Sequence, residues 1–107
     1  MKPPTATSAL RQWYAANQDM LKARFSDALV PTRERNSCGL RLDGDAYFIS
    51  ICAWDQGQCL DIEVLDGSTG MSRHPAVGPC ESIDDLLARL DSFAQWITQT
   101  IPDSKDP

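Results

Sequence analysis

The side chains with the greatest chemical potential in this sequence are its four cysteines, Cys38, Cys52, Cys59 and Cys80. Thiols bind zinc, form disulfides or act as nucleophiles, and each role has a characteristic spacing or partner. These four form no C-x-x-C pair, and three of them fall in or beside segments with the composition of strands. The start of the chain lacks the continuous apolar run of a signal peptide, so we expect a reducing compartment and free thiols. The spacing does not favour a metal site, and the expected compartment does not favour a disulfide.

Three other features suggest chemistry on a first reading. The one histidine, His74, has no cysteine or serine beside it in a recognisable triad arrangement. The acidic segment Asp43–Asp45 lacks the later ligands of a calcium loop, and the glycine-rich segment Asp66–Gly70 lacks the lysine and the following helix of a phosphate loop. We therefore interpret both segments as turns and expect no catalytic residue, metal or cofactor.

The stretch Tyr47–Asp66 predicts two β-strands joined by a turn at Gln56-Gly57. A two-residue turn places only apolar pairs on one face: Ala53 with Leu60, Ile51 with Ile62, and Ile49 with Val64. The same register places a mixture on the other face: Trp54 with Cys59, Cys52 with Asp61, Ser50 with Glu63, and Phe48 with Leu65. We therefore expect one face for a core and another that water or a partner covers.

Two further strands are expected around this hairpin. Residues 38–42 predict a strand, and a turn at Asp43-Gly44 then pairs Leu40 with Tyr47, which places Leu40 on the apolar face. Residues 71–74 predict a fourth strand at the edge of the sheet, and Pro75 is expected to end it and begin a loop.

A helix is expected on each side of these strands. The first begins at an N-cap on Thr7 or Ser8, carries an apolar stripe from Leu10 to Ala28, and ends before Pro31. A polar connector, residues 31–37, follows it.

The second helix begins at Ser82 and ends at Pro102. Trp96 falls off its apolar stripe, so we expect this side chain either to pack under the N-terminal segment or to be exposed for a partner. The stripe consists of Ile83, Leu86, Leu87, Leu90, Phe93, Ala94, Ile97 and Ile101.

The order of these elements predicts an α+β fold, an antiparallel sheet of three to four strands flanked by an N-terminal and a C-terminal helix. With 107 residues, 42% of them hydrophobic and 23% charged, the chain has the composition of one globular domain. We expect a single domain over residues 1–107, with an ordered core at about residues 8–101 and frayed ends.

The net charge of −5 is unevenly distributed. Residues 1–37 carry six Lys/Arg and three Asp/Glu, whereas residues 38–107 carry four and twelve. An acidic sheet and last helix repel nucleic acid and membranes and attract a basic protein, although acidic surfaces also simply aid solubility. The chain has no run of about 18 apolar residues that would span a membrane. These features indicate a cytoplasmic protein that binds neither nucleic acid nor membranes.

The order helix, antiparallel strands, helix, with W-x-x-G at the central hairpin tip, resembles a family of small bacterial immunity proteins, the TriTu-type proteins. These are associated with polymorphic toxins such as those of contact-dependent growth inhibition. The resemblance covers about residues 10–97 and rests on Trp13, on residues 49–57 and 59–66, and on the helix from Asp84 to Trp96. It implies a non-enzymatic cytoplasmic protein that binds the C-terminal domain of a cognate toxin, in many such systems a nuclease such as a tRNase, and blocks it.

A patch on the mixed face is the candidate binding site within this interpretation. Trp54, Asp61 and Glu63 project together, and they combine an aromatic anchor with two carboxylates that suit a basic partner. In the competing view, the first helix wraps this face, and binding falls to acidic residues elsewhere. The candidates elsewhere are Asp43, Asp45, Asp84, Asp85 and Asp91, with Trp96 as a possible aromatic contact.

Two other classes of function remain open at this stage. One is an acidic secretion chaperone, which would normally dimerise through a helix, whereas we expect a monomer in a 1:1 complex with a toxin. The other is a small enzyme that uses His74 with a cysteine.

Overall fold

The computed structural model describes residues 5–25, 27–28, 32–34 and 36–101. Helix α1 (Ala6–Arg24) is followed by two short strands, β1 (Asp27–Ala28) and β2 (Thr32–Glu34). The strands β3 (Ser37–Asp43), β4 (Tyr47–Trp54), β5 (Cys59–Asp66) and β6 (Ser72–Pro79) come next, with a 3₁₀ turn η1 (Gln56–Gln58) between β4 and β5, and helix α2 (Ile83–Thr100) follows.

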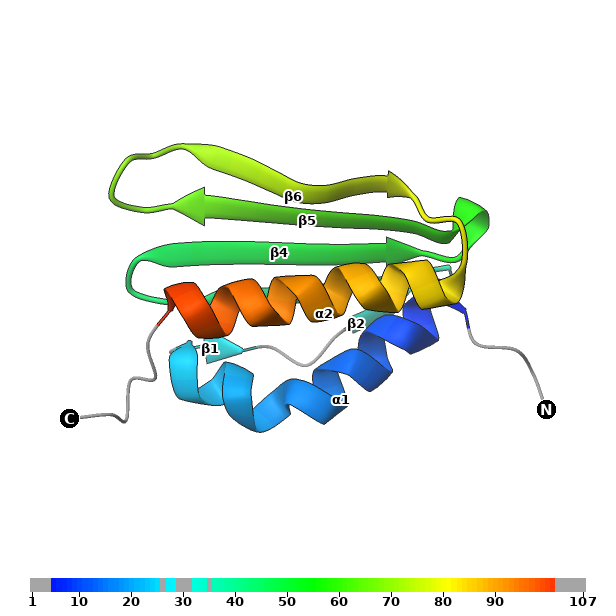
Figure 1. Ribbon diagram of the computed structural model, residues 1–107, viewed down its shortest axis with the longest axis horizontal. Helices are drawn as coiled ribbons and strands as arrows, with labels where there is room; N and C mark the ends of the chain where they lie inside the picture. Colours follow the sequence, from blue (N-terminus) through cyan, green and yellow to red (C-terminus); the bar gives the residue numbers. More distant parts are fainter. Residues whose placement is uncertain (1–4, 26, 29–31, 35, 102–107) are drawn as a thin grey trace.

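Strands β3 to β6 form an antiparallel sheet in chain order, and β1 and β2 both pair with β3. Both helices lie on the same face of this sheet and run in the same direction (Figure 1). This is the predicted α+β arrangement of helix, antiparallel sheet and helix. The two short strands fall in the segments where we expected the end of the first helix and a polar connector. The expected frayed ends, residues 1–4 and 102–107, lie outside the described residues, as does Pro102.

The predicted register of the central hairpin is confirmed. Ala53 faces Leu60 and Trp54 faces Cys59. The same register continues along the whole hairpin as far as the pair of Tyr47 with Asp66. Gln56 and Gly57 are the central residues of the turn, which the Gln58 N–H closes by donating to the Asp55 carbonyl at 3.2 Å. Gly57 has φ 75°, in the left-handed region where a Cβ is disfavoured.

The predicted register between β3 and β4 is wrong. Leu40 faces Ile51 rather than Tyr47, and the turn is closed by the Gly44 N–H donating to the Tyr47 carbonyl at 2.9 Å. The observed pairing sets Leu42 against Ile49, so that apolar side chains meet across the strands. Because the partner of Leu40 moves by four residues, an even number, Leu40 still points to the core face as expected.

Helix α1 begins earlier and ends earlier than predicted. Thr5, not Thr7 or Ser8, is the N-cap: its hydroxyl accepts the Ser8 N–H, and the Ser8 hydroxyl accepts the Thr5 N–H at 2.8 Å. Thr7 is buried inside the first turn, and its N–H donates to Asp55 Oδ1 at 2.9 Å. A carboxylate from the β4–β5 turn therefore completes the positive end of this helix. Residue Ala28, expected in the helix, belongs to β1.

Helix α2 begins where the sequence predicts. The Ser82 hydroxyl accepts the Asp85 N–H at 3.0 Å, and the Asp85 carboxylate accepts the Glu81 N–H at 3.0 Å. At the other end, Arg24 joins the two helices, because its Nε donates to the Ile101 carbonyl at 3.1 Å and its Nη1 to the Met20 carbonyl at 3.3 Å. A cation is favourable at the negative ends of both helices.

Strand β6 continues past Pro75, which we expected to end it, and it runs to Pro79. The pairing with β5 shifts between Ile62 and Val64, so that residues 74 and 75 together oppose Glu63. A bulge on an edge strand accommodates a proline because no ladder hydrogen bond is required from its nitrogen. The predicted edge position of this strand is confirmed, since β6 ends the strand order of the described sheet.

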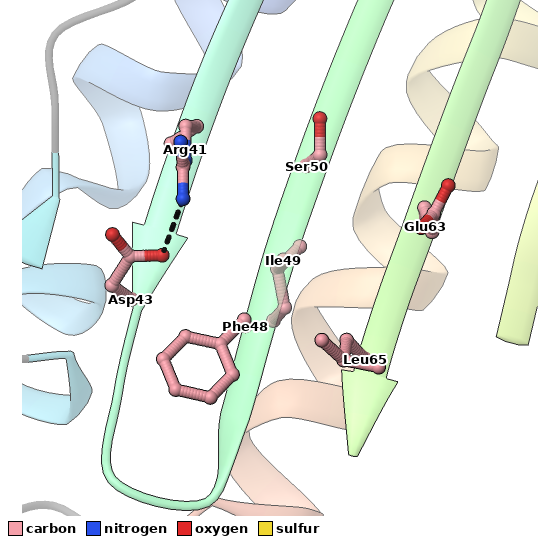
Figure 2. Close-up of a pocket in the computed structure, with 7 residues that line it drawn as sticks. All are labelled: Arg41, Asp43, Phe48, Ile49, Ser50, Glu63 and Leu65. Carbon is pink, nitrogen blue, oxygen red and sulfur yellow. Dashed lines mark ion pairs between the residues drawn. The ribbon is translucent and has the colours of Figure 1, made fainter. Parts of the chain in front are cut away.

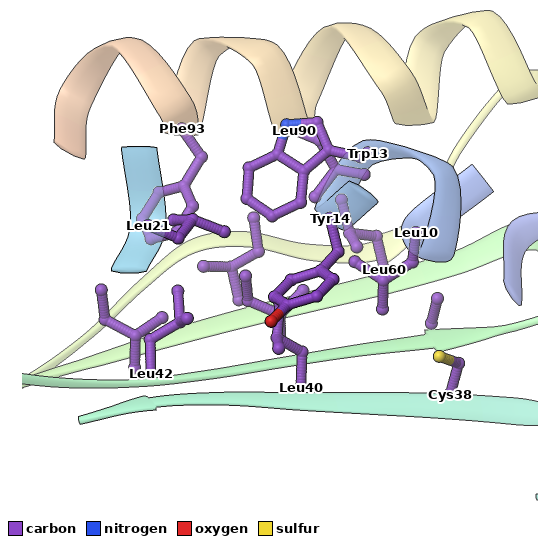
Figure 3. Packing of buried hydrophobic residues seen from close by; sticks show 14 of the residues in the cluster. Leu10, Trp13, Tyr14, Leu21, Cys38, Leu40, Leu42, Leu60, Leu90 and Phe93 are labelled. Carbon is purple, nitrogen blue, oxygen red and sulfur yellow. The ribbon is translucent and has the colours of Figure 1, made fainter. Parts of the chain in front are cut away.

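The core lies between the sheet and the two helices (Figure 3). Trp13 and Tyr14 are buried there, although Trp13 Nε1 and the Tyr14 hydroxyl have no hydrogen-bond partner among the described residues. Such an atom costs about 1–3 kcal/mol, whereas burying an aromatic ring contributes about 4–6 kcal/mol. Apolar burial therefore outweighs the polar cost. The sheet contributes Cys38, Leu40, Leu42, Ile49, Ile51, Ala53, Leu60, Ile62 and Val64.

No helix in the described part of the chain is long and apolar enough to cross a membrane.

The first prediction concerns the core face of α2. Leu90 is fully buried at the centre of its stripe, so Leu90→Ala should lower the free energy of unfolding by about 2–5 kcal/mol. Gln95→Ala, an exposed change on the same helix, is the control and should have an effect below about 0.5 kcal/mol. Urea denaturation followed by circular dichroism measures both, and equal effects would contradict the assigned core.

The second prediction concerns the contact between the hairpin tip and α1. Asp55→Ala removes the acceptor of the Thr7 N–H and should cost about 1 kcal/mol. Asp55→Asn keeps a side-chain oxygen at that position and should cost less, so the difference between the two variants isolates the hydrogen bond. If both variants unfold at the wild-type urea concentration, this contact does not stabilise the helix.

Candidate functional site

The face of the sheet opposite the helices carries the predicted site. We call it the outer face, and Figure 2 shows part of it with the helices behind the strands. Trp54, Asp61 and Glu63 all lie on it, as predicted, because they alternate with the buried residues of β4 and β5. Its members are Arg41 and Asp43 on β3, Phe48, Ser50, Cys52 and Trp54 on β4, Cys59, Asp61, Glu63 and Leu65 on β5, and Val77 on β6.

Neither helix covers this face. Residues of α1 pack into the core with the inward side chains of the sheet, and Figure 1 shows α1 on the same side as α2. The competing expectation, that the first helix wraps the mixed face, is therefore wrong. The apolar stripes of both helices pack instead on the opposite face of the sheet, which holds Leu40, Ile51 and Ile62.

Large apolar side chains are exposed at both ends of the outer face. Phe48 is 40% exposed and Leu65 36% at one end, and at the other end Trp54 is 39% exposed and Val77 58%. Each group lines a shallow pocket, of about 270 Å³ beside Phe48 and Leu65, and of about 350 Å³ beside Trp54 and Val77. Exposed aromatic and aliphatic side chains gathered on one face are typical of a surface that binds another protein.

Charged side chains lie between and beside these groups. Glu63 is exposed and Asp61 half-buried on the middle of β5. On the neighbouring β3, Arg41 Nη2 lies 3.6 Å from Asp43 Oδ1, and both side chains line the Phe48 pocket (Figure 2). The described part of the outer face therefore carries three carboxylates and one guanidinium group, an acidic balance that suits a basic partner.

The structure separates the remaining predicted contact residues. Asp43 belongs to the outer face, whereas Asp45 lies in the β3–β4 turn and lines a different pocket with Arg24, Phe25 and Ile101. Trp96 lies on the helix side, where it stacks on Phe93 with ring centroids 5.5 Å apart and meets Tyr47 edge to face at 5.6 Å. These contacts differ from both positions expected for Trp96. Asp45 and Trp96 therefore do not form one surface with Trp54.

Phe48, Leu65, Val77 and Arg41 belong to the same surface but were not among the predicted site residues. The alternation that places Trp54 outward also places Phe48 and Leu65 outward, so that signal was present in the sequence. Val77 gave no such signal, because it follows Pro75 in a segment predicted to be a loop. Arg41 became a neighbour of this patch only through the observed pairing of β3 with β4.

The edge of the sheet at β6 is poorly suited to pairing with a strand of another protein. This strand carries Pro75, Pro79 and a shift in register, and Gly78 has φ 111°. Proline and bulges prevent another strand from continuing a ladder. Strands β1 and β2 lie along β3 at the opposite side of the sheet.

Cys38, Cys52, Cys59 and Cys80 form no disulfide among the described residues. Burial raises the pKa of the Cys52 thiol above its ordinary value; a hydrogen bond with Ser50 lowers it, and the negative charge of Asp61 raises it further. Burial also raises the pKa of Cys80, against a lowering by Arg89. Thiols with raised pKa carry less thiolate near neutral pH, whereas a nucleophilic cysteine requires more. Among the described residues, no group of three or more His, Cys, Asp or Glu side chains is placed to hold a metal ion.

The third prediction concerns Cys52. Because its pKa is raised, its alkylation by iodoacetamide should reach half of its maximal rate at a higher pH than that of a free thiol. Asp61→Asn removes one cause of the increase and should shift this pH downward. Glu63→Gln, which neutralises the next outward carboxylate on β5, is the control and should shift it less. Peptide mass spectrometry of Cys52 measures the rate, and an unchanged profile in Asp61→Asn would show that the carboxylate does not act on the thiol.

No protein-family model, curated protein or solved structure matches this chain. The functional argument therefore starts from the residues of the outer face and from their chemistry.

Proposed function

We propose that this protein is an immunity protein: in the cytoplasm it binds the C-terminal domain of a cognate bacterial toxin as a monomer in a 1:1 complex and blocks it. The toxin domain is a basic protein, such as a nuclease of the tRNase kind. The observation that carries this proposal is the uncovered outer face, where exposed Trp54 and Phe48 lie beside Asp61 and Glu63.

The composition of this face suits a protein partner. Aromatic side chains provide large contact areas at a small entropic cost, and they dominate binding energy when a partner excludes water around them. Carboxylates beside them mainly increase the rate of association and select the partner. A surface that carries both aromatic side chains and carboxylates supports tight and selective binding.

The charge of the chain points to a basic partner. Residues 38–107, which include the sheet and α2, contain twelve acidic and four basic residues. A nuclease holds the phosphate backbone of its substrate with Lys and Arg, so its active surface is positively charged. An acidic inhibitor is attracted to the same surface and competes with the nucleic acid for it.

The distribution of exposed apolar groups favours this function over that of a secretion chaperone that dimerises through a helix. The large hydrophobic side chains exposed in the described part of the chain are Phe48, Trp54, Leu65, Met71 and Val77. They lie on strands or in the β5–β6 turn rather than on α1 or α2. A helix-mediated dimer needs an apolar stripe on a helix surface, but the stripes of both helices are buried in the core.

The proposal is tested by co-production with the toxin domain encoded by the neighbouring gene. The toxin domain alone should arrest the growth of a bacterial host, and co-production of this protein should restore it. Light scattering of the purified mixture should give the mass of a 1:1 complex. Continued growth arrest together with the absence of a complex would contradict the immunity function.

The fourth prediction assigns the outer face to this complex. Trp54→Ala should weaken toxin binding by about 2 kcal/mol or more, because it removes a partly exposed aromatic anchor. Met71→Ala truncates another exposed apolar side chain, in the β5–β6 turn, and should leave the affinity unchanged. Calorimetry measures both, after circular dichroism confirms that each variant is folded. Equal affinities for the two variants would remove Trp54 from the interface.

A further inference from the structure

The outer face of β4 and β5 has a regular order of side chains along its length. Its four cross-strand pairs are Phe48 with Leu65, Ser50 with Glu63, Cys52 with Asp61, and Trp54 with Cys59. Large apolar groups therefore lie at the two ends, and the two pairs in the middle each contribute one carboxylate. Both carboxylates come from β5, whereas both aromatic rings come from β4.

The two apolar ends are far enough apart to be separate anchor points. Phe48 and Trp54 are six residues apart on β4, and Leu65 and Cys59 are six residues apart on β5. At about 3.3 Å per residue, this separation is about 20 Å. Each end has its own pocket, so one occupant that filled both would lie along the strands and over the carboxylates.

Both ends are shaped by neighbouring glycines. A Cβ at Gly67 would come within 3.2 Å of the Phe48 ring and 3.3 Å of the Ala46 carbonyl, so the absence of a side chain lets the ring lie against this turn. Gly78, beside Val77, lines the pocket at the Trp54 end. A glycine therefore lies beside the exposed apolar side chain at each end of the outer face.

We infer that the occupant of the outer face is a basic amphipathic helix of the toxin domain, lying along β4 and β5. Its apolar side chains enter the Phe48 and Trp54 pockets, and its Lys or Arg side chains lie over Asp61 and Glu63. This inference rests on the proposed function and specifies the chemistry of the partner segment.

A helix fits this surface better than an extended strand. About 13 residues of helix span 20 Å, with apolar side chains recurring on one side every three or four residues. A helix satisfies its own backbone hydrogen bonds, whereas a strand lying on the face of a sheet leaves its N–H and C=O groups without partners. Helices also pack naturally on sheet faces, as α1 and α2 do on the inner face.

Charge argues against a second copy of this chain as the occupant. Two outer faces in contact would bring the carboxylates of β5 close to the same groups of the other copy. Arg41 is the cation on the described outer face, and it already lies beside Asp43. Like charges in a water-excluded interface are unfavourable, whereas a basic helix neutralises them.

The test uses a designed peptide as the probe and the full-length protein. The probe is a helix of about 18 residues, built from Leu and Lys with the leucines on one side, and it is long enough to reach both pockets. The control peptide has the same composition in an order without an apolar side. Two-dimensional NMR of the labelled protein should show shifts of amides in β4 and β5 with the amphipathic peptide, and weaker or no shifts with the control.

Three variants and one control variant examine the anchor points and the charges. Glu63→Lys should weaken peptide binding by about tenfold or more, and Asp19→Lys, the same change at an exposed position on α1, should have little effect. Phe48→Ser and Trp54→Ser should each weaken binding by a similar factor, because each removes the aromatic ring from one apolar end. Increasing salt should reduce the difference between Glu63→Lys and the wild type.

Four results would overturn the inference. They are shifts confined to α1 and α2, equal binding of the two peptides, equal effects of Glu63→Lys and Asp19→Lys, and self-association through Phe48 and Trp54 in light scattering without peptide.

The co-production assay separates this inference from the proposed function. If the Glu63→Lys and Trp54→Ser proteins still neutralise the toxin fully, the immunity function stands and the docking surface is wrong. If the peptide binds as expected but the toxin is not neutralised, the docking surface stands and the immunity function is wrong.

Discussion

The antiparallel pairing of β4 with β5 determines the surroundings of nearly every other element. This one register sends Ile51, Ile62 and their neighbours toward the helices, and it sends Trp54, Asp61 and Glu63 to the opposite side. A displacement by one residue would exchange the two sets, exposing the aliphatic residues and burying two carboxylates. Burying a carboxylate costs far more free energy than any single contact on the outer face contributes. The packing of the core therefore determines which side chains lie on the outer face.

The tip of the same hairpin connects three other parts of the chain. The Asp55 N–H donates to the Asn36 carbonyl just before β3, and its carboxylate accepts the Thr7 N–H in α1. The Gln58 carbonyl accepts the Cys80 N–H at the end of β6. These contacts gather the start of α1, the start of β3 and the end of β6 around one turn. At the other end of the molecule, Arg24 joins the last turns of the two helices. Both helices are thus held near their ends on the same face.

Placing both helices on one face leaves the other face without a helical layer. An antiparallel sheet tolerates water on one side, so the fold itself does not require a further layer. The outer face nevertheless exposes Phe48, Trp54 and Val77, which a face adapted only to water would not need. The central carboxylates keep these apolar groups from forming one continuous patch and so limit non-specific association. In the complex that we propose, the same arrangement selects a partner with basic groups between two apolar anchors.

The sequence by itself determined the class of the fold, the β4–β5 register, the start of α2 and the outward position of Trp54, Asp61 and Glu63. These features depend on local signals: alternation along strands, a glycine in a turn, and a capping serine followed by acidic residues. It did not determine the β3–β4 register, because displacements by an even number of residues leave the alternation unchanged and only packing distinguishes them. Nor did it indicate the extension of β6 past Pro75, which depends on a bulge against β5. Only the tertiary structure decided that α1 lies beside α2, that Trp96 packs on Phe93 and Tyr47, and that Arg41 and Val77 join the outer face. Each of these results from contacts between residues distant in sequence, which local patterns do not encode.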